Sequence, residues 1–261
     1  MPGGPYDSSK TRVAPVFDLL RERADNWILA LLGLVDRSAA KSAANLNLTM
    51  HTGHWGEHEL GLAPPVSLLS WLIRNPTSAL HSQSYSPERS LLAQGDPTTV
   101  SRALSLLRTE GGQSGWHILE GPSYPDVLLE TPDALIVVEG KRTESAPTTH
   151  TTFMEGRHQI WRHIDAAWEV RGRRAVFGLF IVEGQGEAPE VPAVWTAAVA
   201  SAKSDAVLAS SFPHRSAVER SAIAQCLLGA TTWQRVCAEF EIAFSTLPTT
   251  VPSGPTEART N

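Results

Sequence analysis

Two carboxylates and a lysine lie close together in the most apolar part of this sequence. Asp126 is the second residue of the run 125–131, and Glu139 and Lys141 lie at the end of the run 134–141. Carboxylate oxygens supplemented by water are the ligands that Mg²⁺ prefers in proteins. A bound ion of this kind activates water and stabilises negative charge on a phosphate, and a nearby ammonium group can assist both effects. These residue types therefore suit metal-dependent hydrolysis of a phosphodiester.

A tight turn between the two runs determines whether the three side chains meet. Residues 131–134 (Thr-Pro-Asp-Ala) suit a two-residue turn, because proline favours its first central position. Two antiparallel strands joined by that turn place Asp126 opposite Glu139, with Cβ atoms ~5 Å apart. Lys141 leaves the same face as Glu139, because side chains alternate along a strand. We therefore predict that the three groups converge, and that a divalent cation relieves the cost of burying two facing carboxylates.

The pattern around these residues resembles a known motif. Asp126 follows a proline, and residues 127–138 separate it from Glu139, which is followed by a glycine and Lys141. This arrangement is similar to the motif of the PD-(D/E)XK nuclease superfamily, which includes many restriction endonucleases and RecB-like exonucleases. The resemblance implies that Asp126 and Glu139 bind Mg²⁺, for which Mn²⁺ can substitute, and that Lys141 is catalytic. It also implies a nucleic-acid partner, with DNA favoured over RNA, and leaves a homodimer open.

Further candidate residues follow from the same resemblance. RecB-like members often carry a glutamine followed four residues later by a tyrosine; here Gln159 is followed by His163, on one helical face. The glutamine matches and the tyrosine does not. Gln159 would position Lys141 or a phosphate. Superfamily members also often supply a glutamate from upstream of the strands. The candidates for that glutamate are Glu57, Glu59 and Glu110.

Other residues of the helix predicted at 154–170 have two interpretations. Arg157 and Arg162 could contact phosphates, although arginines on helices usually face water. Trp161 and Trp168 are expected in the core.

A second catalytic motif competes with the first. His54, Glu57 and His58 match the H-x-x-E-H signature of inverted zinc metallopeptidases, in which both histidines bind zinc and the glutamate acts as base. Two glycines in this segment disfavour the helix that the signature requires. Glu130 is the loosely placed candidate for a third ligand. A non-catalytic nuclease fold that only binds a partner is the remaining alternative.

Periodicity and apolar runs predict one α/β domain over 13–245, between disordered tails at 1–12 and 246–261. Its expected fold is a restriction-endonuclease-like mixed central sheet flanked by helices, with additional N- and C-terminal helices. A helical lead-in occupies 13–110, the core of helix, three strands, helix and strand about 98–184, and the C-terminal helices 190–245. The expected helices are 16–34, 65–74, 98–108, 154–170, 193–203, 215–228 and 232–240, and the expected strands are 116–120, 125–131, 134–142 and 174–183.

Composition narrows the class of protein. The 261 residues are 42% hydrophobic and 19% charged, as in ordinary globular domains. A net charge of −5 argues against a protein that wraps nucleic acid non-specifically. No apolar run of membrane-spanning length and no signal-peptide pattern occurs, so no membrane partner is expected. Cys226 and Cys237 are expected to be buried thiols in a reducing compartment, which favours a cytoplasmic location.

Overall fold

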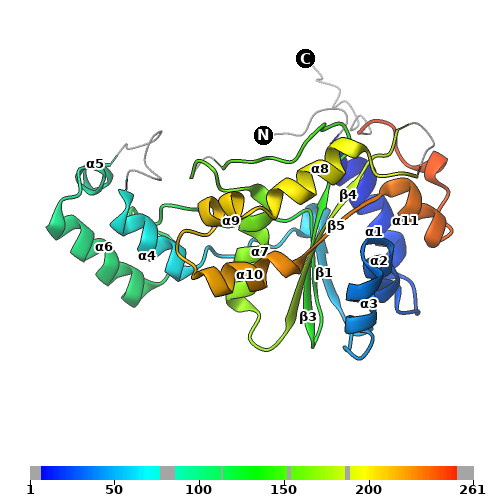
Figure 1. Ribbon diagram of the computed structural model, residues 1–261, viewed down its shortest axis with the longest axis horizontal. Helices are drawn as coiled ribbons and strands as arrows, with labels where there is room; N and C mark the ends of the chain where they lie inside the picture. The colour runs from blue at the N-terminus through cyan, green and yellow to red at the C-terminus, as the bar shows by residue number, and fades with distance from the viewer. Residues whose placement is uncertain (1–6, 77–85, 113, 152–153, 186–188, 252–261) are drawn as a thin grey trace, which may run out of the picture.

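The computed structural model describes residues 7–76, 86–112, 114–151, 154–185 and 189–251 (Figure 1). Within these ranges, five strands form one mixed sheet in the order β1-β2-β3-β4-β5. The pairs β1–β2 and β2–β3 are antiparallel, whereas β3–β4 and β4–β5 are parallel. The fold is therefore α/β with a mixed sheet flanked by helices. The strands are β1 (Thr52–Trp55), β2 (Val127–Glu130), β3 (Ala134–Gly140), β4 (Ala175–Val182) and β5 (Leu227–Thr232).

Helices cover both faces of the sheet, as the apolar runs predicted. Alternate residues of β3 divide between two cores: Ile136 and Val138 face one, and Leu135 and Val137 face the other. Figure 1 shows the two helical layers on opposite sides of the strands. The first layer comprises α1 (Ala14–Arg21), α2 (Trp27–Val35), α3 (Arg37–Ala43) and α11 (Trp233–Glu239). The second comprises α7 (Gln159–Val170), α8 (Ala193–Ala202), α9 (Asp205–Ser211) and α10 (Ala217–Cys226).

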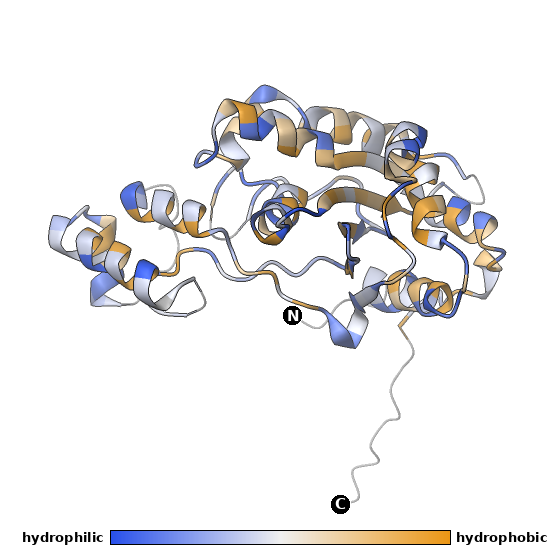
Figure 2. Cartoon of the chain, turned by 90° about the horizontal axis from the view of Figure 1, so that it is seen from below, coloured by the Kyte–Doolittle hydropathy of each residue, from blue (hydrophilic) through white to orange (hydrophobic). Residues whose placement is uncertain are grey.

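Three further helices form a lobe that extends to one side of the sheet in Figures 1 and 2. They are α4 (Val66–Arg74), α5 (Pro87–Ala93) and α6 (Pro97–Glu110). The lobe has an apolar cluster of its own, which includes Leu69, Leu72 and Leu107. Leu62 before the lobe and Ser123 after it form an antiparallel bridge, with two backbone hydrogen bonds of 2.8 Å. This bridge ties the base of the lobe beside the sheet.

The prediction of a strand at 116–120 is wrong. These residues form turns, and Arg89 of α5 donates 2.9 Å hydrogen bonds to the carbonyls of Trp116 and Ile118. The strand next to β2 is instead β1, which comes from before the lobe. Among the described residues, three strands therefore still precede α7, but the lobe is inserted between the first and the second.

Several predicted helices have different limits in the structure. The helix expected at 16–34 is divided into α1 and α2, with Asn26 capping the second. The helix expected at 154–170 begins only at Gln159, because Gly156 adopts a left-handed φ of 76°. Strand β5 lies between the two C-terminal helices and was not predicted. The sequence analysis also missed α3, α5 and α9.

The predicted tails are ordered where the structure describes them. The short helix η1 (Ser9–Val13) buries Arg12, whose guanidinium makes two 2.7 Å bonds to Glu183 and a 2.8 Å bond to the carbonyl of Pro248. Leu247, just after η4 (Phe244–Thr246), is buried. The predicted tails at 7–12 and 246–251 are thus wrong, because one bidentate ion pair anchors both ends to β4. Residues 1–6 and 252–261 lie outside the described residues.

Within the described part of the chain, no helix has the length and apolar character needed to cross a membrane.

Candidate active site

The predicted hairpin register is confirmed. Val127 pairs with Val138 and Glu130 with Leu135 across β2 and β3. The turn closes with a 2.9 Å hydrogen bond from the Thr131 N–H to the Ala134 carbonyl. One position beyond the last pair, this register places Asp126 opposite Glu139.

The carboxylate of Glu139 lies at the centre of the site. Glu139 is 1% exposed, and its Oε1 lies 2.8 Å from Nζ of Lys141. Its Oε2 lies 3.2 Å from Nε2 of His163 on α7. The Lys141 backbone continues the pairing with β4, since its N–H donates to the Ile181 carbonyl at 2.8 Å. The predicted convergence of Glu139 and Lys141 is therefore confirmed, with His163 as an additional member.

Gly140 is the residue between Glu139 and Lys141, and the space around it suits only glycine. Its N–H donates a 2.8 Å hydrogen bond to Oδ2 of Asp126, which lies just before the neighbouring strand β2. A Cβ atom at Gly140 would lie 2.8 Å from Cγ2 of Val13 and 2.9 Å from Cζ2 of Trp233. The absence of a side chain lets η1 and α11 pack against the strand end that carries the site.

The charges divide unequally between the two carboxyl groups. Burial, followed by the charge of Glu139, raises the pKa of Asp126 well above its ordinary value. Burial also acts to raise the pKa of Glu139, but His163 and Lys141 outweigh it and lower that pKa to about 2. Burial acts to lower the pKa of Lys141, yet Glu139 and Asp126 raise it overall. Glu139 is therefore the ionised carboxylate and Lys141 a cation, whereas Asp126 retains its proton more readily.

Of the upstream glutamates, Glu59 interacts electrostatically with the site. Glu59 is exposed, yet its partial burial raises its pKa, and the charges of Asp7 and Glu139 add to the increase. The charge of Glu59 in turn contributes to the raised pKa of Asp126. Glu57 is exposed on the short helix η2 (Gly56–His58). Glu110 is the last residue of α6, and its side chain lies outside the described part of the structure.

The two polar residues predicted on α7 differ in their contacts. Gln159 begins the helix and donates a backbone hydrogen bond to the Thr148 carbonyl, but in the described residues no hydrogen bond joins its side chain to Lys141. His163 contacts Glu139 through Nε2, and its Nδ1 lies 2.5 Å from Oγ of Ser123. Ser123 is fully buried, which excludes it as a nucleophile for an external substrate.

Ser123 and His158 were both missed by the sequence analysis. His158 precedes α7 and is buried, and burial lowers its pKa to about 4 despite the opposing charge of Glu139. It is therefore a neutral imidazole near the site at physiological pH. No local pattern distinguishes these two residues, because their proximity to Glu139 depends on how α7 packs against the sheet.

The zinc-peptidase signature does not adopt the conformation that it requires. His54 lies in β1 and the exposed His58 in η2, so no helix presents both imidazoles on one face. His54 instead lies 3.3 Å from the carboxylate of Glu130. In the part of the chain that the structure describes, no three His, Cys, Asp or Glu side chains form a ready metal cage.

Arg157 and Arg162, which were predicted to contact phosphates or to face water, instead make contacts within the fold. Arg157 is fully buried and lies 2.8 Å from Glu120 and 3.0 Å from Asp165. Arg162 donates to the carbonyls of Gly121 and Pro122. Both predicted alternatives for Arg157 are therefore wrong. Trp161 is buried, as predicted, and Trp168 packs partly buried against the same core.

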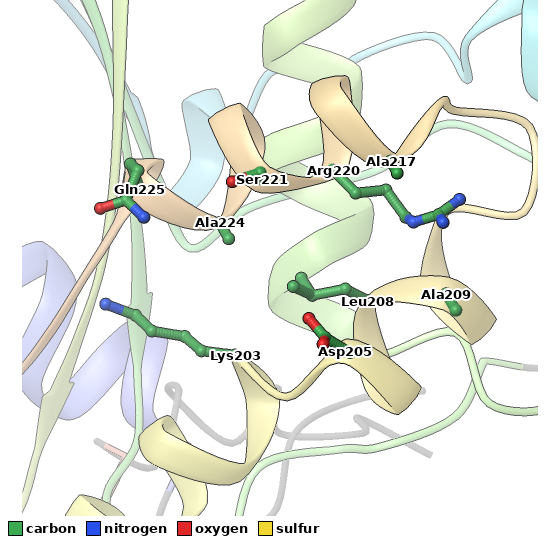
Figure 3. Close-up of a pocket in the computed structure, with 9 residues that line it drawn as sticks. All are labelled: Lys203, Asp205, Leu208, Ala209, Ala217, Arg220, Ser221, Ala224 and Gln225. Carbon is green, nitrogen blue, oxygen red and sulfur yellow. The ribbon is translucent and has the colours of Figure 1, made fainter.

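A hollow of about 490 Å³ lies on the outer side of the second helical layer (Figure 3). Its lining includes Lys203 and Asp205 near the start of α9, and Arg220 on α10. Most of its polar side chains are exposed, and Arg220 is held by the Arg215 carbonyl. None of Asp126, Glu139 or Lys141 lines this hollow. The hollow is therefore separate from the candidate site, which lies at the paired ends of β2 and β3.

Comparisons of the chain with protein-family models, with curated proteins and with solved structures find no match.

Proposed function

We propose that this protein is a Mg²⁺-dependent nuclease that hydrolyses phosphodiester bonds, with DNA the favoured substrate and Mn²⁺ able to replace Mg²⁺. The observation that carries the proposal is the convergence of Asp126, Glu139 and Lys141 at the paired ends of β2 and β3. Two carboxylates and one ammonium group in register on adjacent strands are the parts that metal-assisted phosphodiester hydrolysis needs.

The order of the elements supports a restriction-endonuclease-like core. The predicted core helix at 98–108 is part of α6 in the lobe, so α1 takes its place. Helix α1, strands β1, β2 and β3, helix α7 and strand β4 occur in the order that the resemblance to the PD-(D/E)XK superfamily implies, with α2 and α3 between α1 and β1. The α4–α6 lobe is then an insertion between the first two strands. The base of this insertion, at Ser123, contacts His163 at the site, which suits a role in choosing the substrate.

The donor set fits a hard divalent cation. Asp126 carries a pKa raised by burial and by the charge of Glu139, whereas the charge of Glu139 is compensated by His163 and Lys141. The raised pKa indicates that a second negative charge at this site, on Asp126, is not fully compensated by the protein. Mg²⁺ usually binds through one or two carboxylates and keeps several waters, so Asp126 and Glu139 would suffice, with Glu59 nearby. When bound, the ion would activate a water and offset charge on the phosphate.

The chain's own residues then have distinct tasks. The raised pKa of Lys141 keeps its ammonium charged, so this group orients the attacking water and neutralises the developing phosphorane rather than accepting a proton. Asp126 must lose its proton before it can bind a cation. Gly140 holds the Asp126 carboxyl in place through its backbone N–H.

Cleavage of circular plasmid and of labelled single-stranded DNA tests the proposal. The wild type should cut in Mg²⁺ or Mn²⁺ and not in EDTA, while Asp126→Ala and Lys141→Ala should lose cleavage. Lys203→Ala, which removes an exposed lysine on the outer hollow, is the matched control and should retain it. Full activity in both site variants would contradict the proposal. A wild type that cuts neither DNA nor RNA would favour the non-catalytic binding module.

A further inference from the structure

A buried histidine and a buried carboxylate face each other beside the proposed site. Nε2 of His163 and Oε2 of Glu139 lie 3.2 Å apart, and this contact lowers the pKa of Glu139, yet the two atoms are poorly aligned for a hydrogen bond. Both side chains are 2% exposed. The contact therefore satisfies the two buried groups only in part.

The other ring nitrogen of His163 does have a partner. Nδ1 lies 2.5 Å from Oγ of Ser123, whose backbone is fixed by the two 2.8 Å hydrogen bonds to Leu62. A cation that displaces the proton from Nε2 would leave Nδ1 to donate its proton to Ser123. Metal-binding histidines are held in this way, with one nitrogen hydrogen-bonded and the other directed at the ion.

The separation of these two atoms also suits a shared ion. An imidazole nitrogen and a carboxylate oxygen that bind one cation at ordinary bond lengths and near-perpendicular angles lie roughly 3 Å apart. The 3.2 Å between Nε2 of His163 and Oε2 of Glu139 is close to this value.

We propose that His163 binds, through Nε2, the same divalent cation as Glu139, so that a transition-metal ion such as Mn²⁺ or Co²⁺ binds more tightly than the Mg²⁺ that also supports the proposed reaction. Imidazole nitrogen is a good ligand for first-row transition metals, whereas Mg²⁺ prefers oxygen. This assignment rests on the proposed metal site at Glu139, but its test is independent of cleavage.

The chain contains a matched histidine–glutamate pair as a control. Nε2 of His54 lies 3.3 Å from Oε1 of Glu130, at almost the same separation. That pair is partly exposed, and Arg174 also contacts Glu130 at 3.2 Å. Both side chains are open to solvent and the guanidinium of Arg174 compensates the charge of Glu130, so His54 should not bind an ion.

The experiment is Mn²⁺ binding to the full chain, followed by pulsed electron paramagnetic resonance for directly bound ¹⁴N. The wild-type spectrum should show nitrogen coupling. His163→Gln should remove that coupling and weaken Mn²⁺ binding. The loss of affinity should exceed the roughly 10-fold to 100-fold loss that is typical when a metal ligand loses its outer hydrogen-bond partner. Ser123→Ala should retain the coupling with weaker binding. His54→Gln should change neither.

The outcomes separate this proposal from the nuclease assignment. Wild-type protein that binds no Mn²⁺, or binds it without nitrogen coupling, overturns the assignment of His163, whether or not DNA is cut. Coupling that persists in a folded His163→Gln variant also overturns it. Nitrogen coupling that depends on His163 in a protein that cuts no nucleic acid would support the metal site and contradict the nuclease. The wild-type spectrum serves as a test even where a variant fails to fold.

Discussion

Asp126 accepts a 2.8 Å hydrogen bond on Oδ2 from the backbone N–H of Gly140, across the end of the β2–β3 pair. This bond holds the Asp126 carboxyl beside Glu139 on the neighbouring strand. The hydrogen bond lowers the pKa of Asp126, but burial and the charge of Glu139 raise that pKa by more. The folded protein therefore maintains a carboxyl group where its ionised form is unfavourable, as is common at functional sites.

Asp126→Asn should stabilise the metal-free protein at neutral pH by about 1 kcal/mol. Asparagine removes the repulsion from Glu139, and its side-chain oxygen can still accept the hydrogen bond from Gly140. Because the folded pKa of Asp126 is raised, its carboxyl contributes stability below the unfolded value of 3.8 and loses it as pH rises through the folded pKa. Urea unfolding at a series of pH values should therefore show a gain that grows with pH. A gain independent of pH would contradict this explanation.

Glu139→Gln should destabilise the protein by roughly 3 kcal/mol at neutral pH, because it leaves Lys141 and His163 without their buried partner. The folded pKa of Glu139 is about 2, against an ordinary value of 4.5. Its contribution is therefore present above the ordinary value and disappears as pH falls toward about 2. The difference between wild type and variant should shrink over that interval in acid unfolding curves.

Glu144→Gln is the control for the Glu139 variant. Glu144 lies 4.0 Å from the same ammonium of Lys141, but its side chain is 44% exposed. An exposed ion pair contributes little, so the unfolding free energy should change by less than about 0.5 kcal/mol. Equal losses in both variants would contradict the role given to burial.

Gly140→Ala should cost about 1–3 kcal/mol, because the new methyl group would overlap Val13 and Trp233. Gly33→Ala in α2 is the matched control. A Cβ atom there would meet Ala40 at an ordinary 3.6 Å, and alanine favours a helix over glycine by up to about 1 kcal/mol. Thermal unfolding should thus shift in opposite directions for the two variants. An unchanged melting temperature for Gly140→Ala would contradict the close packing inferred at the strand end.

Arg157→Met should cost about 3–5 kcal/mol, because Glu120 and Asp165 would lose a buried cationic partner. Arg173→Met, at an exposed position, should stay within about 0.5 kcal/mol of wild type. The measurement is the free energy of unfolding in urea. A small effect at Arg157 would contradict this prediction. It would mean that the other partners of the two carboxylates compensate: Arg162, 3.4 Å from Glu120, and His214 and Arg215, 3.1 Å and 2.9 Å from Asp165.

The sequence alone determined the features that depend on neighbouring residues. The turn at 131–134 and the alternation along β2 and β3 predicted which residues pair, and so brought Asp126, Glu139 and Lys141 together. Pairing within a hairpin depends on turn length and side-chain period, both of which are local.

Only the tertiary structure decided which distant segments complete the sheet and the site. β1 pairs with β2 across the whole α4–α6 lobe, and His163 and Glu59 approach Glu139 from separate elements. Arg157 likewise reaches Glu120 and Asp165 only inside the folded core. Partners this far apart in the chain are selected by the packing of helices on the sheet and by the need to compensate buried charge. Neither condition is visible in a local pattern of residues.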